Sequence, residues 1–280
     1  MKNIIVKNKI IYLKGQSMEY KKIFLDTCVL SDIGRMNKEE RNMLAFNFVA
    51  NYKFQIIITL YQIMELESFK DKQIRNNVYT FLEMCYVGIG KNFYRLFEEE
   101  VSHKQNIDIV EYDLSMFTYD KNDNLMNFKG FKDSIINSKE YQKNKKEHED
   151  ICTDLQLIER PTDDINLYTK VLIIHNLKKY FNINNFDISY NDIPGLYTYS
   201  YSYANKVGSS SLKEKPTEMN DVCMSYLAPY MDIIIAERKQ VARYMELKQK
   251  KDFNKLDHVI IKKHSDVIKY NTNGSISFNI

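Results

Sequence analysis

The 280-residue sequence predicts an α/β protein built around a central parallel sheet. Two observations support this prediction. Short runs of β-branched and aromatic residues, typical of strands buried on both faces, alternate with longer amphipathic stretches that are typical of helices. The chain also has only eight glycines and four prolines. The first proline is Pro161, so the first half contains few residues that break helices.

The first part of the chain alternates between strand and helix. Strands are expected at residues 20–26 and 55–59, where the apolar runs Ile-Phe-Leu and Ile-Ile-Ile occur. An amphipathic helix is expected between them, over residues 36–51. Two more helices follow the second strand, at about residues 60–69 and 72–86. This order of elements is typical of a parallel sheet, in which each helix crosses from one strand to the next.

The middle of the chain, residues 91–215, is expected to be a mostly helical insertion. Helices are predicted at residues 94–104, 150–159 and 165–180, the last with a clear apolar face. Residues 197–203 alternate tyrosine with hydroxyl residues, which favours a strand or an exposed aromatic ribbon.

The alternation of helix and strand returns after the insertion. A helix is expected at residues 220–228, stopped by Pro229. The apolar run at 231–236 predicts a strand, residues 241–250 a helix, and residues 258–262 a last strand.

Composition narrows the class of protein. With 44% hydrophobic and 28% charged residues, the chain is typical of a soluble globular protein. It has no apolar run of the length that spans a bilayer, about 18 residues, and its four cysteines are far apart, so we expect reduced thiols and a cytoplasmic location. The net charge of +3 is too small to indicate nucleic-acid binding by itself. Residues 1–19 are expected to be an N-terminal extension or a short edge hairpin, with Met18 as an alternative start.

Four acids stand where a parallel sheet would bring them together. Asp26 ends the first predicted strand, and Glu237 ends the strand at 231–236. Glu65 lies on the helix after the second strand, and Asp221 begins the helix before Pro229. The ligands of open parallel sheets bind beyond the carboxyl ends of the strands. Carboxylate oxygens are the ligands that Mg²⁺ and Mn²⁺ prefer, so the pattern predicts a metal site.

Each of these acids also has a purely structural interpretation. Asp26 or Asp221 could cap a helix. Glu65 could be a solvated helix residue, and Glu237 could pair with a neighbouring cation on the surface. The metal-site hypothesis depends on the four positions taken together.

The same segments resemble the PIN domain family of metal-dependent ribonucleases. Ile23-Phe-Leu-Asp-Thr-Cys-Val-Leu resembles the opening strand and first acid of that family. The segments around Glu65, Asp221 and Glu237 resemble its later acidic motifs, in the right order. The resemblance covers about residues 20–90 and 216–270, and it divides the chain into a first part of a core at 20–90 and a second part at 216–280. It implies a three-layer α/β/α fold, Mg²⁺ or Mn²⁺ as cofactor, and RNA as the usual substrate.

The chain departs from the family pattern in three places. Cys28 occupies a position that is usually Asn. The fourth acidic position has Ala-Glu where a hydroxyl residue and Asp are usual, so Asp232 is an alternative to Glu237 as a metal ligand. The insertion is longer than in compact members, and it could supply a further acid, for which the segment His148-Glu149-Asp150 is the best candidate and Asp150 an alternative fourth ligand.

Substrate binding needs cations beside the acids. The segment after Glu237 contains Arg238, Lys239 and Arg243, which are the predicted contacts to phosphates, together with the hydroxyl residue Thr27. A solvated helix face is the structural alternative for this basic segment.

The leading hypothesis is therefore a metal-dependent endoribonuclease, with Asp26, Glu65, Asp221 and Glu237 as catalytic metal ligands. The family's habits suggest a toxin or anti-phage effector, with an antitoxin or another regulatory protein as partner. No membrane partner is expected, and homo-oligomerisation stays open. The alternatives are a catalytically decayed binding module and a structure-specific DNA nuclease.

Overall fold

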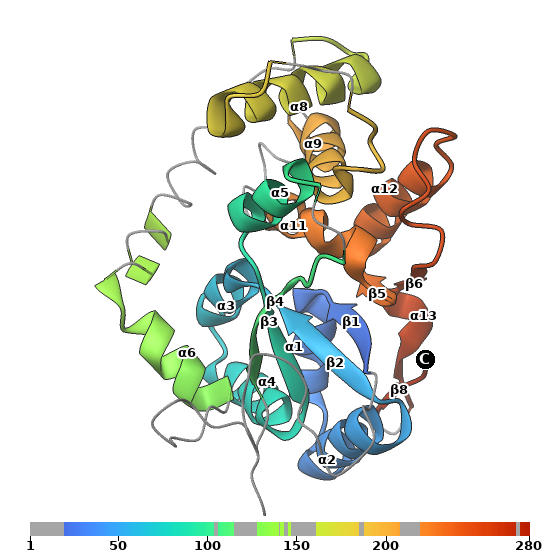
Figure 1. The fold of residues 1–280 in the computed structure, drawn as a ribbon. Helices are drawn as coiled ribbons and strands as arrows, with labels where there is room; N and C mark the ends of the chain where they lie inside the picture. The colour runs from blue at the N-terminus through green and yellow to red at the C-terminus, as the bar shows by residue number, and fades with distance from the viewer. Residues whose placement is uncertain are drawn as a thin grey trace, which may run out of the picture.

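A six-stranded sheet, mostly parallel, runs through the centre of the computed structural model (Figure 1). The structure describes residues 20–103, 106–114, 128–139, 141–142, 145–146, 161–184, 188–207, 219–272 and 275–280. The strand order is β4-β3-β2-β1-β5-β6. The strands are β1 (Lys21–Leu25), β2 (Phe54–Ile58), β3 (Tyr86–Gly90), β4 (Val110–Leu114), β5 (Ile233–Ala236) and β6 (Ile260–Lys263). All neighbours pair in parallel except β3 and β4, which are antiparallel. The predicted α/β fold with a parallel central sheet is confirmed at this level.

Helices cover both faces of the sheet because successive strand residues point to opposite sides. Ile23 and Leu25 of β1 enter one apolar core, and Phe24 between them enters the other. The first core is closed by α1 (Thr27–Arg35), α2 (Lys38–Phe46), its π-helical continuation (Asn47–Asn51), α3 (Leu60–Glu67), α4 (Lys72–Met84) and α6 (Phe128–Ile136). The second core is closed by α5 (Phe93–Val101), α8 (Ile165–Phe181), α9 (Pro194–Lys206), the 3₁₀ helix Ser225–Tyr230 and α12 (Arg238–Lys248).

Two short elements complete the fold near the C-terminus. The helix α13 (His264–Val267) follows β6 directly, and β7 (Ile268–Tyr270) pairs with β8 (Ile276–Phe278) in an antiparallel hairpin. Ile268 and Ile276 of this hairpin pack into the first core. The sequence analysis did not predict the hairpin, because strands of three residues are too short to show a period.

The strand β3 lies where the sequence suggested only the end of a helix. The helix expected at about residues 72–86 is followed at once by this strand, to which Gly88 and Gly90 belong. A Cβ added to Gly88 would come within 2.9 Å of Ile57 Cδ1, and one added to Gly90 within 3.1 Å of Leu227 Cδ1. The glycines therefore make room for apolar side chains from neighbouring segments, which is one reason for glycine inside a strand.

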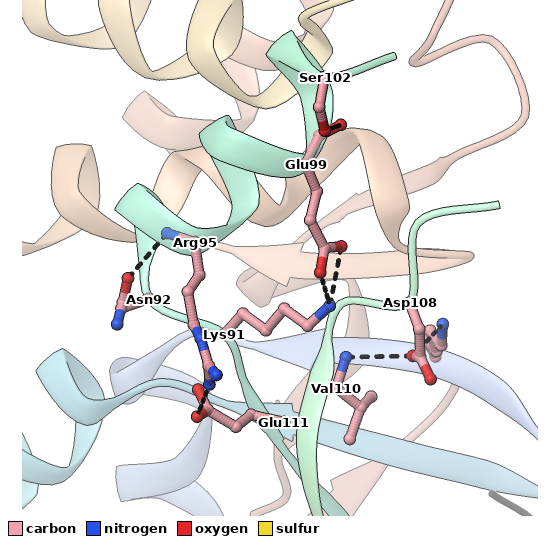
Figure 2. Close-up of polar contacts among 9 residues, drawn as sticks. Lys91, Asn92, Arg95, Glu99, Ser102, Asp108, Val110 and Glu111 are labelled. Carbon is pink, nitrogen blue, oxygen red and sulfur yellow. Dashed lines mark hydrogen bonds and ion pairs between the residues drawn. The ribbon is translucent and has the colours of Figure 1, made fainter. Parts of the chain in front are cut away.

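The insertion is attached to the sheet by a strand as well as by helices. The strand β4 extends the sheet beyond β3, and α5 lies between these two strands in the chain (Figure 2). Figure 2 shows Arg95 of α5 paired with Glu111 of β4, and Lys91 paired with Glu99. These ion pairs hold α5 to the edge strand β4 and to Lys91, which directly follows β3.

The prediction of a strand or exposed ribbon over residues 197–203 was wrong, because this segment lies within α9. Tyr197 and Tyr201 pack into the second core, while Tyr199 and Tyr203 also pack against a smaller cluster between α8 and α11 (Met219–Met224). A helix that is buried on most sides needs no single apolar stripe, so its sequence lacks the usual period of 3.6. The alternation of tyrosine with small hydroxyl residues was thus misinterpreted as a strand pattern.

Several predictions concern segments outside the described residues. These are the N-terminal extension at 1–19, the helix at 150–159 and the candidate ligand Asp150. In the described part of the chain, no helix is both long and apolar enough to cross a membrane.

Candidate active site at the carboxyl edge of the sheet

Asp26 lies directly beyond the carboxyl end of β1 and begins α1. It is 5% exposed, and its backbone N–H donates to the carbonyl of Ile235 in the adjacent strand β5. One side-chain oxygen, Oδ1, accepts a hydrogen bond from the backbone N–H of Thr27 at 2.6 Å. The other, Oδ2, accepts from the backbone N–H of Glu237 at 3.1 Å. Asp26 therefore caps a helix, as the structural interpretation predicted, and also connects the first and last acidic segments.

Glu237 reaches the same edge through the register of the sheet. Leu25 pairs with Ile235, so the residues that follow β1 and β5 emerge side by side. Glu237 is the first residue after β5 and the N-cap of α12, and its side chain is exposed. Asp232 stands at the other end of β5, where its Oδ2 accepts a hydrogen bond from the backbone N–H of Lys22 at 2.7 Å. Of the two candidates for the fourth position, only Glu237 lies at the edge that Asp26 occupies.

Glu65 is positioned by two sets of hydrogen bonds. Thr59 and Gln62 form a capping box at the start of α3, and the Gln62 side-chain amide donates to the carbonyl of Leu25 at 2.7 Å. This bond holds α3 against the end of β1. Thr27 Oγ1 then donates to Glu65 Oε2 at 2.6 Å. Thr27 was predicted to contact substrate, but its hydroxyl is engaged with this carboxylate.

Asp221 lies in α11 and contacts two residues of α12. Gln240 Nε2 donates to the Asp221 backbone carbonyl at 3.2 Å, and Arg243 Nη2 lies 3.6 Å from Asp221 Oδ2. The Asp221 side chain is 22% exposed and that of Arg243 is 9% exposed. The third acid is therefore mostly buried with a small exposed part, and the guanidinium beside it is nearly enclosed.

The pKa values show that the four acids share one electrostatic environment. Burial, followed by the charges of Asp26 and Glu237, raises the pKa of Glu65 to about 7, against the hydrogen bond from Thr27. Burial likewise raises the pKa of Asp221 to about 8, with additional repulsion from Asp26, Glu65 and Glu237. The pKa of Asp26 is also raised by burial, against the hydrogen bonds from the Glu237 and Thr27 amides. We call Asp26, Glu65, Asp221 and Glu237 the acidic cluster.

The carboxylates of the acidic cluster are suitable ligands for a hard divalent cation, but their side chains are not arranged to coordinate one. Among the residues that the structure describes, no group of three His, Cys, Asp or Glu side chains is arranged to hold a metal ion as it stands. The oxygens are instead engaged by the protein, through backbone amides at Asp26, Thr27 at Glu65 and Arg243 at Asp221. A set of carboxylates that repel one another fits Mg²⁺ or Mn²⁺ in charge and in ligand type.

The basic segment after Glu237 divides into two kinds of residue. Arg238 and Lys239 are exposed in the first turn of α12, as the predicted phosphate contacts would require. Arg243 is buried and points toward Asp221. Cys28, the departure from the family pattern, is a neutral thiol, because burial and the neighbouring carboxylates raise its pKa.

Sequence reasoning missed two residues near this edge. Lys206, the last residue of α9, is 6% exposed, and the charges of Arg243, Asp221 and Glu237 act on it. No sequence signal marks it, because it comes from the insertion. His264 follows β6 as Glu237 follows β5, and it pairs with buried Asp32 at 2.6 Å. The repeated strand-then-polar pattern could have identified His264.

Comparisons of the chain with protein-family models, with curated proteins and with solved structures found no match.

Proposed function

We propose that this protein hydrolyses phosphodiester bonds in RNA with the help of Mg²⁺ or Mn²⁺. The observation that carries the proposal is the convergence of four carboxylates, from four separate segments, on the carboxyl edge of a parallel sheet. Burial first, and then repulsion between the acids, raise the pKa values of Glu65 and Asp221 to about 7 and about 8. Groups whose pKa values are strongly perturbed beside an accessible edge are typical of functional sites.

In this proposal, Asp26, Glu65, Asp221 and Glu237 hold the cation. When bound, the ion supplies activation of the attacking water and neutralisation of charge on the leaving oxygen. The protein's own part is to hold the carboxylates. The amides of Thr27 and Glu237 fix Asp26, and Thr27 Oγ1 orients Glu65. Arg238 and Lys239 lie next to Glu237 and would contact the phosphates of the bound strand.

The choice of RNA, and a role as a toxin or anti-phage effector with an antitoxin partner, come from the resemblance to PIN domains. The three-layer PIN-like core belongs to the same proposal. Its support is the sheet order, with β1 at the centre between β2 and β5, and the helices on both faces.

The test is cleavage of an end-labelled single-stranded RNA in Mn²⁺, in Mg²⁺ and in EDTA, with a DNA strand of the same sequence in parallel. We expect the wild type to cut RNA only with a divalent ion and Asp26→Asn to lose at least about 100-fold in rate. Asp232→Asn is the matched control, because it removes the same charge at the opposite edge of the sheet and keeps an acceptor for Lys22.

Three outcomes would contradict the proposal in different ways. Cutting of DNA alone would identify a DNA nuclease. Equal losses in Asp26→Asn and Asp232→Asn would place the chemistry elsewhere. Metal-independent RNA binding without cleavage, under every ionic condition, would favour the binding module whose core has lost catalysis.

A further inference from the structure

A histidine stands at the same edge of the sheet as the acidic cluster. Ala236 of β5 pairs in parallel with Lys263 of β6, so the residues that follow these two, Glu237 and His264, leave the sheet side by side. Neighbouring strands in a sheet are about 4.8 Å apart. His264 begins α13, which contacts both β5 and β6 (Figure 1). The tertiary structure therefore places a histidine next to the fourth acid.

The charge of His264 also acts on the first acid. Burial raises the pKa of Asp26, and the positive charge of His264 is one of the effects that lower it. Within the described ranges, however, the ion pair of His264 is with Asp32, and no hydrogen bond joins it to the acidic cluster. The imidazole is therefore close enough to interact with the charges of the acids, but it is not occupied by them.

Asp32 of α1 holds one nitrogen of the imidazole. Its carboxylate is 5% exposed, and Oδ2 lies 2.6 Å from His264 Nε2. An unprotonated nitrogen would repel a carboxylate at this distance, so Nε2 carries a proton. The Nε2 atom is buried, and the contact is an ion pair whose angle is unsuited to a regular hydrogen bond. One side of the ring is thus fixed inside the protein.

The other ring nitrogen, Nδ1, is open. The His264 side chain is 25% exposed, and in the part of the chain that the structure describes Nδ1 has no hydrogen-bond partner and is not enclosed. With the proton on Nε2 fixed, Nδ1 is a donor when the ring is charged and an acceptor when it is neutral. A histidine held by a carboxylate at one nitrogen is suited to transfer a proton at the other.

A structural role is the alternative, in which Asp32 and His264 only tie α13 to α1. Asp32, however, already has a cation on its own helix, because Arg35 Nη1 lies 2.5 Å from Oδ1. The Tyr270 hydroxyl of β7 is a further neighbour of this carboxylate. Neutralisation of a buried acid therefore does not require the imidazole, and the consequence of the second ion pair is a fixed and charged His264.

We propose that His264 donates a proton from Nδ1 to the ribose oxygen that departs from phosphorus, and that Asp32 positions the imidazole for this transfer. The inference rests on the proposed function, since it concerns the same reaction at the same edge. It adds to the four carboxylates a residue that supplies the proton of the leaving group.

The proton transfer balances as follows. The oxygen of a water molecule forms a bond to phosphorus, and one proton of that water passes to solvent. The bond between phosphorus and the ribose oxygen breaks, and its electron pair stays on that oxygen, which takes the Nδ1 proton and departs as a hydroxyl group. The neutral imidazole then regains a proton from solvent. Proton donation of this kind contributes about 10²- to 10⁴-fold to a rate.

The test compares two phosphodiesters that differ in their need for a proton. The ribose alkoxide of RNA is a strong base and departs slowly unless it is protonated, whereas bis(p-nitrophenyl) phosphate releases p-nitrophenolate, a stable anion. Both are assayed with Mn²⁺, and kcat and KM are recorded. We expect His264→Gln to reduce kcat for RNA by about 100-fold, with little change in KM, and to keep kcat for the p-nitrophenyl ester within about 3-fold.

Two further variants separate proton transfer from packing. Asp32→Asn should lose part of the rate on RNA and keep the rate on the p-nitrophenyl ester. His258→Gln removes a histidine from an exposed position before the opposite end of β6, and it should retain both rates. Thermal unfolding of each variant shows that the fold is kept.

Two results would overturn the inference while the proposed function stands. These are unchanged rates in His264→Gln, and equal losses on the two substrates, which would indicate a disturbed site rather than a missing proton. A wild type that cleaves neither substrate would reject the proposed function and this inference with it. The wild-type rates therefore distinguish failure of the function from failure of the proton donor.

The supporting result is a loss confined to RNA. It would show that His264 acts on the leaving group, because a residue that only holds the fold or the cation affects both substrates.

Discussion

Thr27 Oγ1 donates a hydrogen bond of 2.6 Å to Glu65 Oε2, and so joins the first two acidic segments of the chain. Thr27 is 3% exposed, and its backbone N–H donates to Asp26 at the same time. One small residue therefore positions two carboxylates, from different elements, at the carboxyl edge of the sheet. Residues that orient metal ligands in this way are typically important for activity although they touch no metal.

Replacing Thr27 with valine should reduce activity more than stability. Valine keeps the shape but leaves Glu65 without its donor, so we expect RNA cleavage to fall by about 10- to 100-fold. Thr27→Ser retains the hydroxyl and should stay close to the wild type. Initial rates at saturating Mn²⁺ would measure the effect, and equal rates for the valine and serine variants would refute the role of this bond.

The metal-free protein should lose stability as pH rises from weakly acidic to weakly basic. The pKa of Glu65 rises from an ordinary 4.5 to about 7 on folding, and that of Asp221 from 3.8 to about 8. The folded state therefore binds more protons at these two acids than the unfolded state does, so their contribution to stability is greatest below about pH 4 and is lost as pH passes 7 and 8. Urea unfolding in EDTA at several pH values would measure the trend, and Asp221→Asn should flatten it. If the free energy of unfolding of the wild type rose between pH 4 and pH 8, and Asp221→Asn showed the same pH dependence, the proposed effect of the raised pKa values would be contradicted.

Divalent ions should restore the stability that the metal-free protein loses at weakly basic pH. A cation that binds only the folded state stabilises it by about 2.7 kcal/mol at 100 times its dissociation constant. We expect Mn²⁺ to raise the thermal unfolding midpoint at pH 8 and EDTA to abolish the increase. Asp26→Asn should remove the response, whereas Asp232→Asn should keep it. A response that survives Asp26→Asn would place the ion at another site.

Gln62 should be needed to hold α3 against the sheet. It is fully buried, and its side-chain amide donates to the Leu25 carbonyl at 2.7 Å. Gln62→Ala leaves that carbonyl without its partner, and we expect a loss of about 1–3 kcal/mol in the free energy of unfolding. Gln73→Ala, at an exposed position of α4, is the control and should cost little. Similar denaturation midpoints for both variants would show that the Gln62 bond contributes no more than a surface contact.

Glu100 should make the anchoring of α9 depend on pH. It is 1% exposed and accepts hydrogen bonds from the backbone amides of Gly195 and Leu196 in the first turn of α9 and from the Tyr230 hydroxyl. Burial nevertheless raises its pKa to about 7, so the stability of the wild type relative to Glu100→Gln should fall as pH rises through 7. Chemical denaturation at pH 5 and pH 8.5 would measure the difference. Glu98→Gln, at an exposed site on the same helix, should show no such dependence.

The sequence by itself determined the alternation of strands and helices in the core and the order of the acidic residues along the chain. The β-branched runs at residues 23–25 and 56–58 are buried strands, as their composition required, because only a two-sided interior accommodates continuous apolar residues. Asp26 and Glu237 each follow such a strand, so local sequence was enough to place them at strand ends. Local sequence could not choose between Asp232 and Glu237. That choice depends on the direction of β5 beside β1, which is a property of the assembled sheet.

Only the tertiary structure decided what surrounds the acids. The tyrosine-rich segment forms α9 because it is packed on several sides, and packing of this kind overrides the local preference for a strand. The same packing brings Lys206 to the acids from a distant part of the chain. Proximity between residues far apart in sequence arises when helices dock on a common core, so no periodicity or motif within the insertion could have predicted it.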